Sequence, residues 1–295
     1  MAVVARSRSI NGPWEDCPHN PIVHTSDADE PWLSRGHATP VQGPNEDWWL
    51  VYHGYENGYR TLGRQMLLEP LVWTEDGWPQ ANAGTLSHPI RKPVPKSRAS
   101  RSAARSQDFR TSSLGEGLYS FMPQGSIGNS GVGQTNGKLT LSARGKAPHE
   151  ANLLVLDVGD RSYTITTQVE LERDVSAGLL LFYDKHTYCG ITAGRNMVSA
   201  YKLGTDASRD LRPGLKASSK MTLKLVNTRN TVTFFLSDDG TSWKTACSFD
   251  VSGYHPNNFG GFLSLRAAIC ALGEGTASFT HLDYRADPSS NLLST

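Results

Sequence analysis

The chain has 295 residues and a formal net charge of +1, which gives no global electrostatic case for nucleic-acid binding. No apolar run approaches the ~20 residues of a membrane-spanning helix, and the N-terminal stretch lacks the apolar core of a secretory signal. Hydrophobic residues make up 38% of the chain, and the 28 glycines and 16 prolines are typical of many short strands joined by turns.

Residues 1–90 combine strand patterns with turn signals. The strand-like segments are VVARS, GHATPV, DWWLVYH and LGRQMLLEPLVW, and the turns are GP, PNED and DGWP. A strand, a turn and an aromatic strand recur here, as in a blade of a β-propeller. There are strands for only one to one and a half blades, and no internal repeat is visible.

The aromatic stretch WWLVYHGYENGYRTLGRQ, residues 48–65, has two interpretations. Trp48, Trp49 and Tyr52 lie along a strand, where burial in the core of a blade is favoured. His53, Tyr55 and Tyr59 lie at or past the strand end, where aromatic rings stack on the apolar faces of sugars.

A basic run, RKPVPKSRASRSAAR, follows at residues 91–105 and predicts a solvated linker. It is short and has no aromatic residue to stack on bases, which argues against a nucleic-acid or membrane role. We therefore divide the chain into residues 1–90, a linker at residues 91–106, a second domain at residues 107–287 and a tail at residues 288–295.

The second domain alternates between apolar and polar residues with period two, or runs continuously apolar. Strand candidates are residues 163–172, 178–184, 221–227, 231–237 and 260–268. Their spacing and the intervening turns predict an antiparallel β-sandwich, and no segment shows a helical stripe over a dozen residues. None of the four cysteines (Cys17, Cys189, Cys247 and Cys270) has metal-ligand spacing, so buried free thiols are expected.

Several phrases resemble one known family when taken in order. ARSRSINGPWE, NPIV, RGHATPV and the aromatic stretch resemble the closing part of the catalytic five-bladed β-propeller of glycoside hydrolase family 43, which contains β-xylosidases and α-L-arabinofuranosidases. AGLLLFYDKHTYCGI, VTFFLSDDGTSWK, VSGYHPNNFGGFLSLRAA and FTHLDYRA resemble the concanavalin-A-like β-sandwich that follows the propeller in its β-xylosidase-type members. The resemblance implies an all-β fold in which a partial propeller precedes that sandwich.

The resemblance also implies inverting hydrolysis of xylose- or arabinose-containing polysaccharides. That chemistry needs a general acid and a general base about 6.5–9.5 Å apart. In the family these carboxylates, and a third that tunes the acid, come from earlier blades. We therefore expect a truncated chain that lacks all three, and we assign no catalytic residue. An extracellular parent enzyme is favoured.

The resemblance identifies binding residues rather than catalytic ones. Arg64 matches an arginine that contacts sugar hydroxyls, although a structural arginine paired with a carboxylate is the alternative. His37 matches a histidine near the propeller axis that helps to hold a central calcium in many members, although a core histidine is equally compatible. The other expected substrate contacts come from the aromatic stretch itself: His53, Tyr55, Tyr59 and Glu56. For Glu56 a loop carboxylate near Arg60 is the alternative. The expected ligand is a xylo- or arabino-oligosaccharide, and this chain requires no cofactor.

Two roles remain open for the sandwich. It either packs on the propeller as a structural module or binds carbohydrate through Tyr254, Phe259 or Trp243. A self-standing, non-catalytic binding or structural protein is therefore the alternative function.

Overall fold

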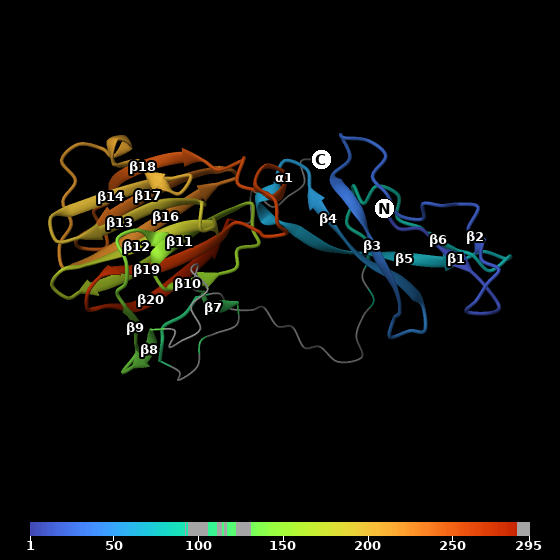
Figure 1. The fold of residues 1–295 in the computed structure, drawn as a ribbon, viewed down its shortest axis with the longest axis horizontal. Coiled ribbons are helices and arrows are strands. Elements are labelled where there is room, and N and C mark those ends of the chain that lie inside the picture. The colour runs from blue at the N-terminus through green and yellow to red at the C-terminus, as the bar shows by residue number, and fades with distance from the viewer. Residues whose placement is uncertain (92, 94–105, 111–113, 115–116, 122–130, 288–295) are drawn as a thin grey trace. The chain divides into compact units, whose positions relative to one another are not determined.

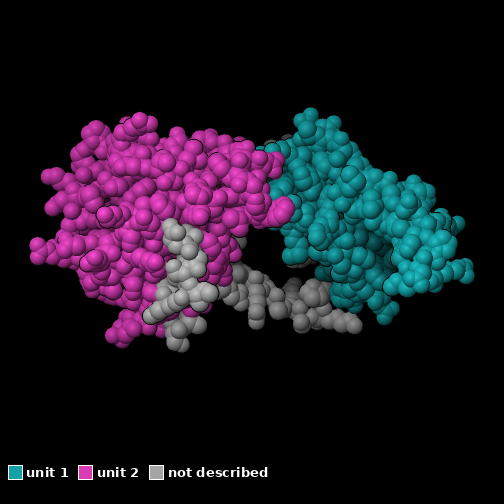
Figure 2. Space-filling model, viewed as in Figure 1, with its two compact units in different colours: residues 1–101 teal, residues 102–295 magenta. Residues whose placement is uncertain are grey.

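The computed structural model describes residues 1–91, 93, 106–110, 114, 117–121 and 131–287. It contains two compact units, unit 1 at residues 1–101 and unit 2 at residues 102–295 (Figure 2). Apart from residues 91, 93 and 106, the expected linker lies outside the described residues, as does the expected tail.

The expected all-β fold class is confirmed (Figure 1). Over the described ranges, the helical segments are α1 (Pro256–Phe259) and three short 3-10 turns, η1 (Arg60–Leu62), η2 (Pro148–Glu150) and η3 (Ser208–Asp210). None of the helices in this described part has the length and apolar character needed to cross a membrane.

Unit 1 is built on one antiparallel four-stranded sheet with the order β3-β4-β5-β6. Its strands are β3 (Trp32–Gln42), β4 (Trp48–Glu56), β5 (Arg64–Trp73) and β6 (Pro79–Ala81). A separate two-stranded sheet pairs β1 (Ala5–Arg6) with β2 (Glu15–Asp16), so the strand expected over VVARS is only two residues long. One sheet of this form corresponds to a single propeller blade.

Burial along β4 separates its aromatic residues. Trp49 and Tyr52 are buried, as expected, but Trp48 is only half-buried and packs edge-on against Trp73, with ring centroids 5.7 Å apart. β4 continues to Glu56, three residues beyond the expected end, because it pairs with β5 along its length. His53 and Tyr55 are therefore strand residues held by the sheet.

Unit 2 is a β-sandwich of two seven-stranded antiparallel sheets. The first, in the order β15-β14-β13-β12-β19-β10-β7, comprises β7 (Leu118–Phe121), β10 (Leu153–Leu156), β12 (Val175–Asp184), β13 (Thr187–Gly194), β14 (Met197–Lys202), β15 (Thr205–Asp206) and β19 (Arg266–Gly273). The second, in the order β18-β17-β16-β11-β20-β9-β8, comprises β8 (Val132–Thr135), β9 (Lys138–Ser142), β11 (Ser162–Leu171), β16 (Lys220–Thr228), β17 (Thr231–Ser237), β18 (Lys244–Asp250) and β20 (Thr276–Ala286).

The two sheets differ in how their faces are buried. β11 alternates between buried and half-buried residues, as a strand with one face toward the core does. β13 is buried at every position, because residues such as Ile191 face the main core while Tyr188 belongs to a second cluster with Leu180 and Phe182. The continuous apolar runs in the sequence thus correspond to strands buried on both faces.

One expected strand is wrong in part. β19 begins at Arg266, whereas the sequence pattern placed a strand over residues 260–268. Gly260 and Gly261 have φ of 75° and 70°, a left-handed conformation that ends α1 and turns the chain. Residues 260–265 therefore form a loop, and Phe262 within it is 74% exposed. All four cysteines are free and buried, as expected.

Candidate functional site

The β4–β5 hairpin brings three of the expected site residues together. Arg64, the first residue of β5, lies opposite Tyr55 in the antiparallel register, and His53 is two residues from Tyr55 on the same face of β4. Arg64 Nε donates a hydrogen bond to the Tyr55 hydroxyl at 3.2 Å, and Arg64 Nη1 lies 3.4 Å from His53 Nε2. Arg64 is exposed and Tyr55 is buried, so a fixed ring anchors a solvent-facing guanidinium.

The contact with Arg64 defines the protonation of His53. A guanidinium can only donate, so His53 Nε2 accepts and the proton of the neutral ring is on Nδ1. The Nδ1 atom is buried and has no hydrogen-bond partner within the described residues. Burial, the charge of Arg64 and the nearby His37 lower the pKa of His53, which keeps the ring neutral near pH 7. The Nδ1–H group of His53 is therefore a buried donor without an acceptor among the described residues.

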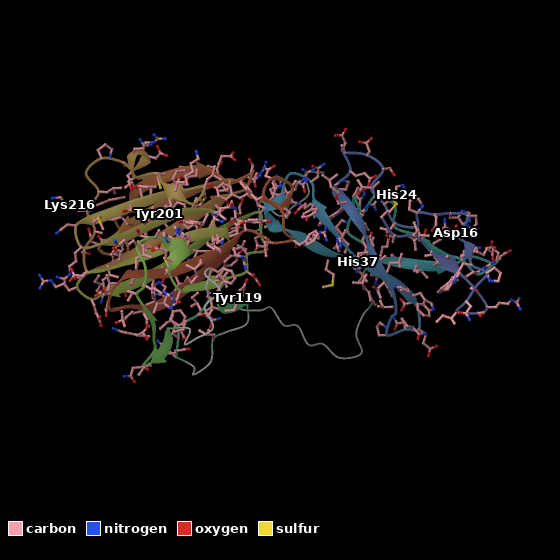
Figure 3. All side chains as sticks on the ribbon, in the orientation of Figure 1. Asp16, His24, His37, Tyr119, Tyr201 and Lys216 are labelled. Atoms are coloured by element: carbon pink, nitrogen blue, oxygen red, sulfur yellow. The ribbon has the colours of Figure 1, made fainter. Side chains whose placement is uncertain are left out.

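His37 lies on β3 (Figure 3), and its ring centroid is 5.7 Å from that of His53. Its side chain is exposed. Calcium prefers six to eight oxygen ligands. No group of three or more His, Cys, Asp or Glu residues that could hold a metal ion occurs among the residues that the structure describes. The expected calcium near His37 therefore stays a prediction, because the described side chains around it do not form such a group.

Glu56 and Tyr59 lie further along the hairpin. Glu56 is the last residue of β4 and is buried, while Tyr59 is half-buried and precedes η1. A backbone hydrogen bond of 3.0 Å from Tyr59 N to Glu56 O holds the turn. Glu56 is therefore a buried strand residue and not a solvated loop carboxylate.

A buried ion pair that sequence reasoning did not find lies in the same unit. Arg35 Nη2 is 2.7 Å from Glu30 Oε2, and both side chains are more than 90% buried. Arg35 Nη1 also donates to Gly84 O at 2.8 Å, whereas its Nε has no partner in the described part of the chain. Arg35 lines a hollow of about 390 Å³ with His24, Asp27 and Arg60 among its other residues. Nothing in the sequence around Glu30 and Arg35 indicates that these two residues pair in the interior.

Glu69 is another buried carboxylate of unit 1, and it is held by two hydrogen bonds. Glu69 Oε1 accepts a hydrogen bond from the Tyr52 hydroxyl at 2.6 Å, and its Oε2 accepts one from Ala83 N at 3.0 Å. Burial and the contact with Glu69 raise the pKa of Tyr52 well above its ordinary value. Glu69 is 1% exposed, so it holds the sheet together rather than facing solvent.

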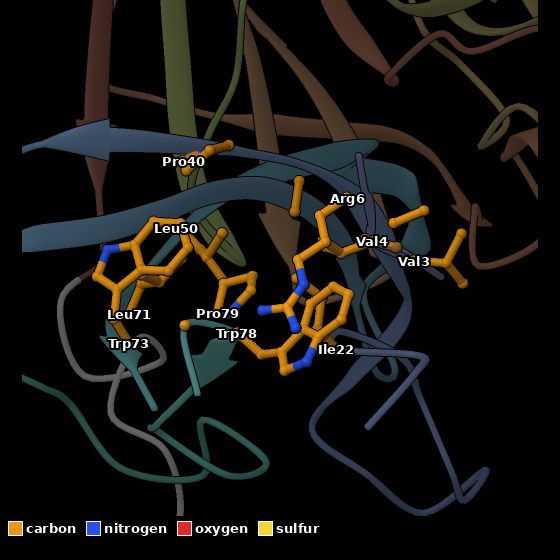
Figure 4. A pocket seen from close by; sticks show the side chains of 14 residues that line it. Val3, Val4, Arg6, Ile22, Pro40, Leu50, Leu71, Trp73, Trp78 and Pro79 are labelled. Atoms are coloured by element: carbon orange, nitrogen blue, oxygen red, sulfur yellow. The ribbon is translucent and has the colours of Figure 1, made fainter. Parts of the chain in front are cut away.

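An apolar hollow of about 250 Å³ lies between the sheet and the N-terminal segment (Figure 4). Leu50, Leu71, Trp73 and Trp78 contribute to its lining, and the guanidinium of Arg6 lies over the Trp78 ring at 4.0 Å from the centroid. Apolar side chains of both the sheet and the N-terminal segment line this hollow, which presents few polar groups.

The aromatic residues proposed for sugar binding by the sandwich are not all available. Tyr254 is 3% exposed, and its hydroxyl accepts a hydrogen bond from Leu203 N at 3.0 Å, so it belongs to the core. Trp243 is half-buried with Lys224 Nζ 3.7 Å from its ring centroid. Phe259 is 43% exposed.

Two family models match the chain. The model of glycosyl hydrolases family 43 matches residues 1–79. The model of the β-xylosidase C-terminal concanavalin A-like domain matches residues 128–285, and this match alone covers more than half of the chain. Both matches lie where the sequence resemblance placed a propeller portion and a sandwich.

Individual relatives match short parts of the chain at higher identity. A non-reducing end α-L-arabinofuranosidase of Bacteroides ovatus is 42% identical over 82 residues, which are 26% of this chain and 16% of the relative. A β-xylosidase of Bacillus subtilis is 34% identical over 96 residues, 28% of this chain and 18% of the relative.

Solved structures match nearly the whole chain. The GH43 protein BlXynB from Bacillus licheniformis has a TM-score of 0.82 at 23% identity, over 97% of this chain and 60% of its own. A xylan β-1,4-xylosidase from Bacillus halodurans has a TM-score of 0.78 at 19% identity, over 96% and 59%. The chain thus covers about 60% of the length of these structures, and the likeness confirms the fold.

Proposed function

Because the chain belongs to glycoside hydrolase family 43, we propose that it takes part in hydrolysing O-glycosyl bonds in xylose- or arabinose-containing polysaccharides. Residues 1–90 contribute contacts to a xylo- or arabino-oligosaccharide, and the acid–base pair is not among them. The names of the similar proteins, a β-xylosidase and an α-L-arabinofuranosidase, support this substrate class.

The observation that carries the proposal is the cluster of Arg64, Tyr55 and His53. Sugars present hydroxyl groups that accept hydrogen bonds, and a planar guanidinium held in place offers several donors in fixed directions. Tyr55 and His53 fix Arg64 by the contacts at 3.2 and 3.4 Å while the arginine stays exposed. Tyr59 and Glu56 complete the binding set that we propose.

Two of the three buried carboxylates that the structure describes in unit 1, Glu30 and Glu69, support the absence of an acid–base pair, because both are engaged in contacts within the unit. Glu30 is committed to Arg35 and also accepts a hydrogen bond from Ser26 N at 2.7 Å. Glu69 is committed to Tyr52 and Ala83 N. A general acid or base must instead lie within hydrogen-bond reach of the substrate proton. The proposal requires no cofactor in this chain, and a calcium near His37 would need ligands other than a cluster of His, Cys, Asp or Glu side chains among the described residues.

Titration calorimetry of the full chain with xylotriose and arabinotriose tests the proposal. Replacing Arg64 by alanine removes charge-assisted hydrogen bonds, so we expect binding of one of these sugars to weaken roughly ten- to hundredfold. Arg60→Ala is the matched control, because this arginine lies four residues away and lines a different hollow. Equal affinity in the wild type and the Arg64→Ala variant, or no binding by the wild type, would refute the role of this cluster.

A further inference from the structure

Unit 1 has a third hollow, lined by polar residues and formed by the two-stranded sheet and the β5–β6 turn. Its volume is about 610 Å³, within the usual range of small-molecule sites. The residues that line it include Arg6, Ser7, Arg8, Trp14, Glu15 and Asp76. None of them belongs to the Arg64 cluster, and Asp16, which follows Glu15 in β2, lies well apart from His37 in Figure 3.

The Trp14 side chain is exposed, and the neighbouring Gly12 contributes to this exposure. Its side chain is 60% accessible, although tryptophan is usually largely buried. Gly12 has a φ of 83°, and a Cβ atom on this glycine would lie 3.1 Å from Trp14 Cδ1. The chain therefore brings a glycine against one edge of the indole and leaves the ring accessible. Apolar CH faces of sugars pack well on such a ring.

Arg6 lines the hollow and is held in place by three contacts. Its guanidinium stacks over Trp78 (Figure 4), its Nε is 3.0 Å from Glu15 Oε2, and its Nη1 donates to Asp76 O at 2.6 Å. These contacts link β1 to β2 and to the β5–β6 turn. Arg8, in contrast, has no hydrogen bond or ion pair within the described residues, so its donors face the hollow without a fixed partner.

The charge around the hollow selects the kind of ligand. Two arginines, Arg6 and Arg8, are balanced by two carboxylates, Glu15 and Asp76. A balanced lining gives neither an anion nor a cation an electrostatic advantage. It offers donors and acceptors together beside an aromatic face, which is the combination that a neutral, polyhydroxylated ring requires.

We propose that this hollow is a second carbohydrate site that holds a β-linked pentose chain against Trp14, away from the Arg64 cluster. The choice of a pentose chain rests on the proposed function. The stacking and the hydrogen bonds are inferred from the exposed Trp14 ring and the polar side chains that line the hollow. Trp14 carries the apolar face of one sugar ring, Arg8 donates to hydroxyl groups, and Asp76 and Glu15 accept from them. The site increases the residence of the protein on polysaccharide without taking part in bond cleavage.

Affinity electrophoresis of the full chain in native gels with soluble arabinoxylan tests this site. We expect the wild type to be retarded relative to a gel without polysaccharide, and Trp14→Ala to weaken the apparent affinity about tenfold. Arg8→Ala should weaken it severalfold, and Trp14→Phe should retain most of it. Phe262→Ala is the control, because it removes an exposed aromatic side chain in the other unit. Thermal unfolding of each variant establishes that the fold is retained.

The outcomes separate this site from the Arg64 cluster. Retardation that is lost in Trp14→Ala and kept in Arg64→Ala supports the second site, whatever the fate of the proposed function. Retardation that is kept in Trp14→Ala and lost in Arg64→Ala overturns the second site and leaves the proposed function standing. A wild type that is not retarded, or a Trp14→Ala variant that migrates like the wild type, also overturns it.

Discussion

Arg64 and Tyr55 face each other across the β4–β5 hairpin, and the arginine Nε donates a hydrogen bond to the tyrosine hydroxyl at 3.2 Å. The buried ring fixes one end of an exposed guanidinium. We expect Tyr55→Phe to keep the packing and to weaken the binding of xylo- or arabino-oligosaccharides about three- to tenfold, because Arg64 loses its anchor. Calorimetric titration measures the change.

Tyr52→Phe is the matched control for this prediction. Tyr52 lies on the same strand, is equally buried, and donates to Glu69 instead of contacting Arg64. Its removal leaves a buried carboxylate short of a partner, so it should lower the free energy of unfolding by about 1–3 kcal/mol and leave sugar affinity unchanged. A Tyr55→Phe variant that loses only stability would show that the hydroxyl has no role in binding.

The environment of His53 predicts a pH dependence. Burial, Arg64 and His37 lower its pKa in the folded state below the ordinary value of about 6.5. As the pH falls, the unfolded chain therefore takes up this proton before the folded chain does. The stability that the neutral ring contributes is present above about pH 6.5 and is lost as the pH falls from there through the lowered pKa.

Proton NMR of the histidine rings and urea unfolding between pH 7.5 and 5.0 check this dependence. The His53 resonance should titrate below pH 6.5, and Arg64→Ala should raise its midpoint because a repelling charge is removed. His53→Gln should lose less stability on acidification than the wild type, whereas His19→Gln, at an exposed position, should behave as the wild type does. A His53 midpoint at or above 6.5 would contradict the described environment.

The sequence predicted the repeating parts of the fold better than its irregular parts. Period-two alternation in residues 163–172 follows directly from one buried sheet face, and β11 confirms it. Residues 260–268 look equally strand-like, but the left-handed Gly260 and Gly261 turn the chain, and only Arg266 onward pairs. Hydrophobicity alone does not report backbone conformation at a glycine.

The candidate site shows the same limit. The resemblance identified Arg64, and the aromatic pattern at the strand end identified His53 and Tyr55. Their mutual contact depends on the register that sets Tyr55 opposite Arg64. The pairing of Glu30 with Arg35 depends on burial, which a charged pair five residues apart does not reveal. The burial of Tyr254, a candidate for sugar binding by the sandwich, is equally hidden from the sequence, because its hydroxyl accepts from a backbone donor inside the core.

The Glu30–Arg35 pair makes a stability prediction for unit 1. Breaking a buried pair leaves the remaining charge without compensation, so Glu30→Gln or Arg35→Met should lower the free energy of unfolding by about 3–5 kcal/mol. Six of the seven tryptophans lie in residues 1–78, so intrinsic fluorescence during urea unfolding reports mainly on this unit.

The pair formed by Arg6 and Glu15 is the matched control, because both of its side chains are exposed. Glu15→Gln should change the unfolding free energy by about 1 kcal/mol or less. The double variant Glu30→Gln with Arg35→Met should recover part of the loss, since it leaves neither charge alone. Losses of similar size at the two pairs would show that the Glu30–Arg35 pair is not shielded from water.

The proposed absence of an acid–base pair predicts low activity. Each proton-transfer role contributes roughly 10²–10⁴-fold to rate. We therefore expect the chain alone to hydrolyse nitrophenyl xyloside and arabinofuranoside at no more than the background rate, even at concentrations where oligosaccharide binding is saturated. Turnover that a single Asp or Glu substitution within residues 1–90 abolishes would place a catalytic carboxylate in this chain.

Two adjacent phenylalanines on β17 test which face of the strand meets the sandwich core. Phe234 is fully buried in the main core cluster, whereas Phe235 is half-buried on the opposite face with Lys224 Nζ 4.7 Å from its ring centroid. Phe234→Ala should lower the free energy of unfolding of unit 2 by about 3–5 kcal/mol, because it leaves a cavity between the sheets. Phe235→Ala should cost much less, because water and the lysine stem can occupy the space. Urea unfolding followed by far-ultraviolet circular dichroism measures both. Equal losses, or a larger loss at Phe235, would mean that the register of β17 is shifted by one residue. Such a shift would place its apolar side chains on the face away from the core.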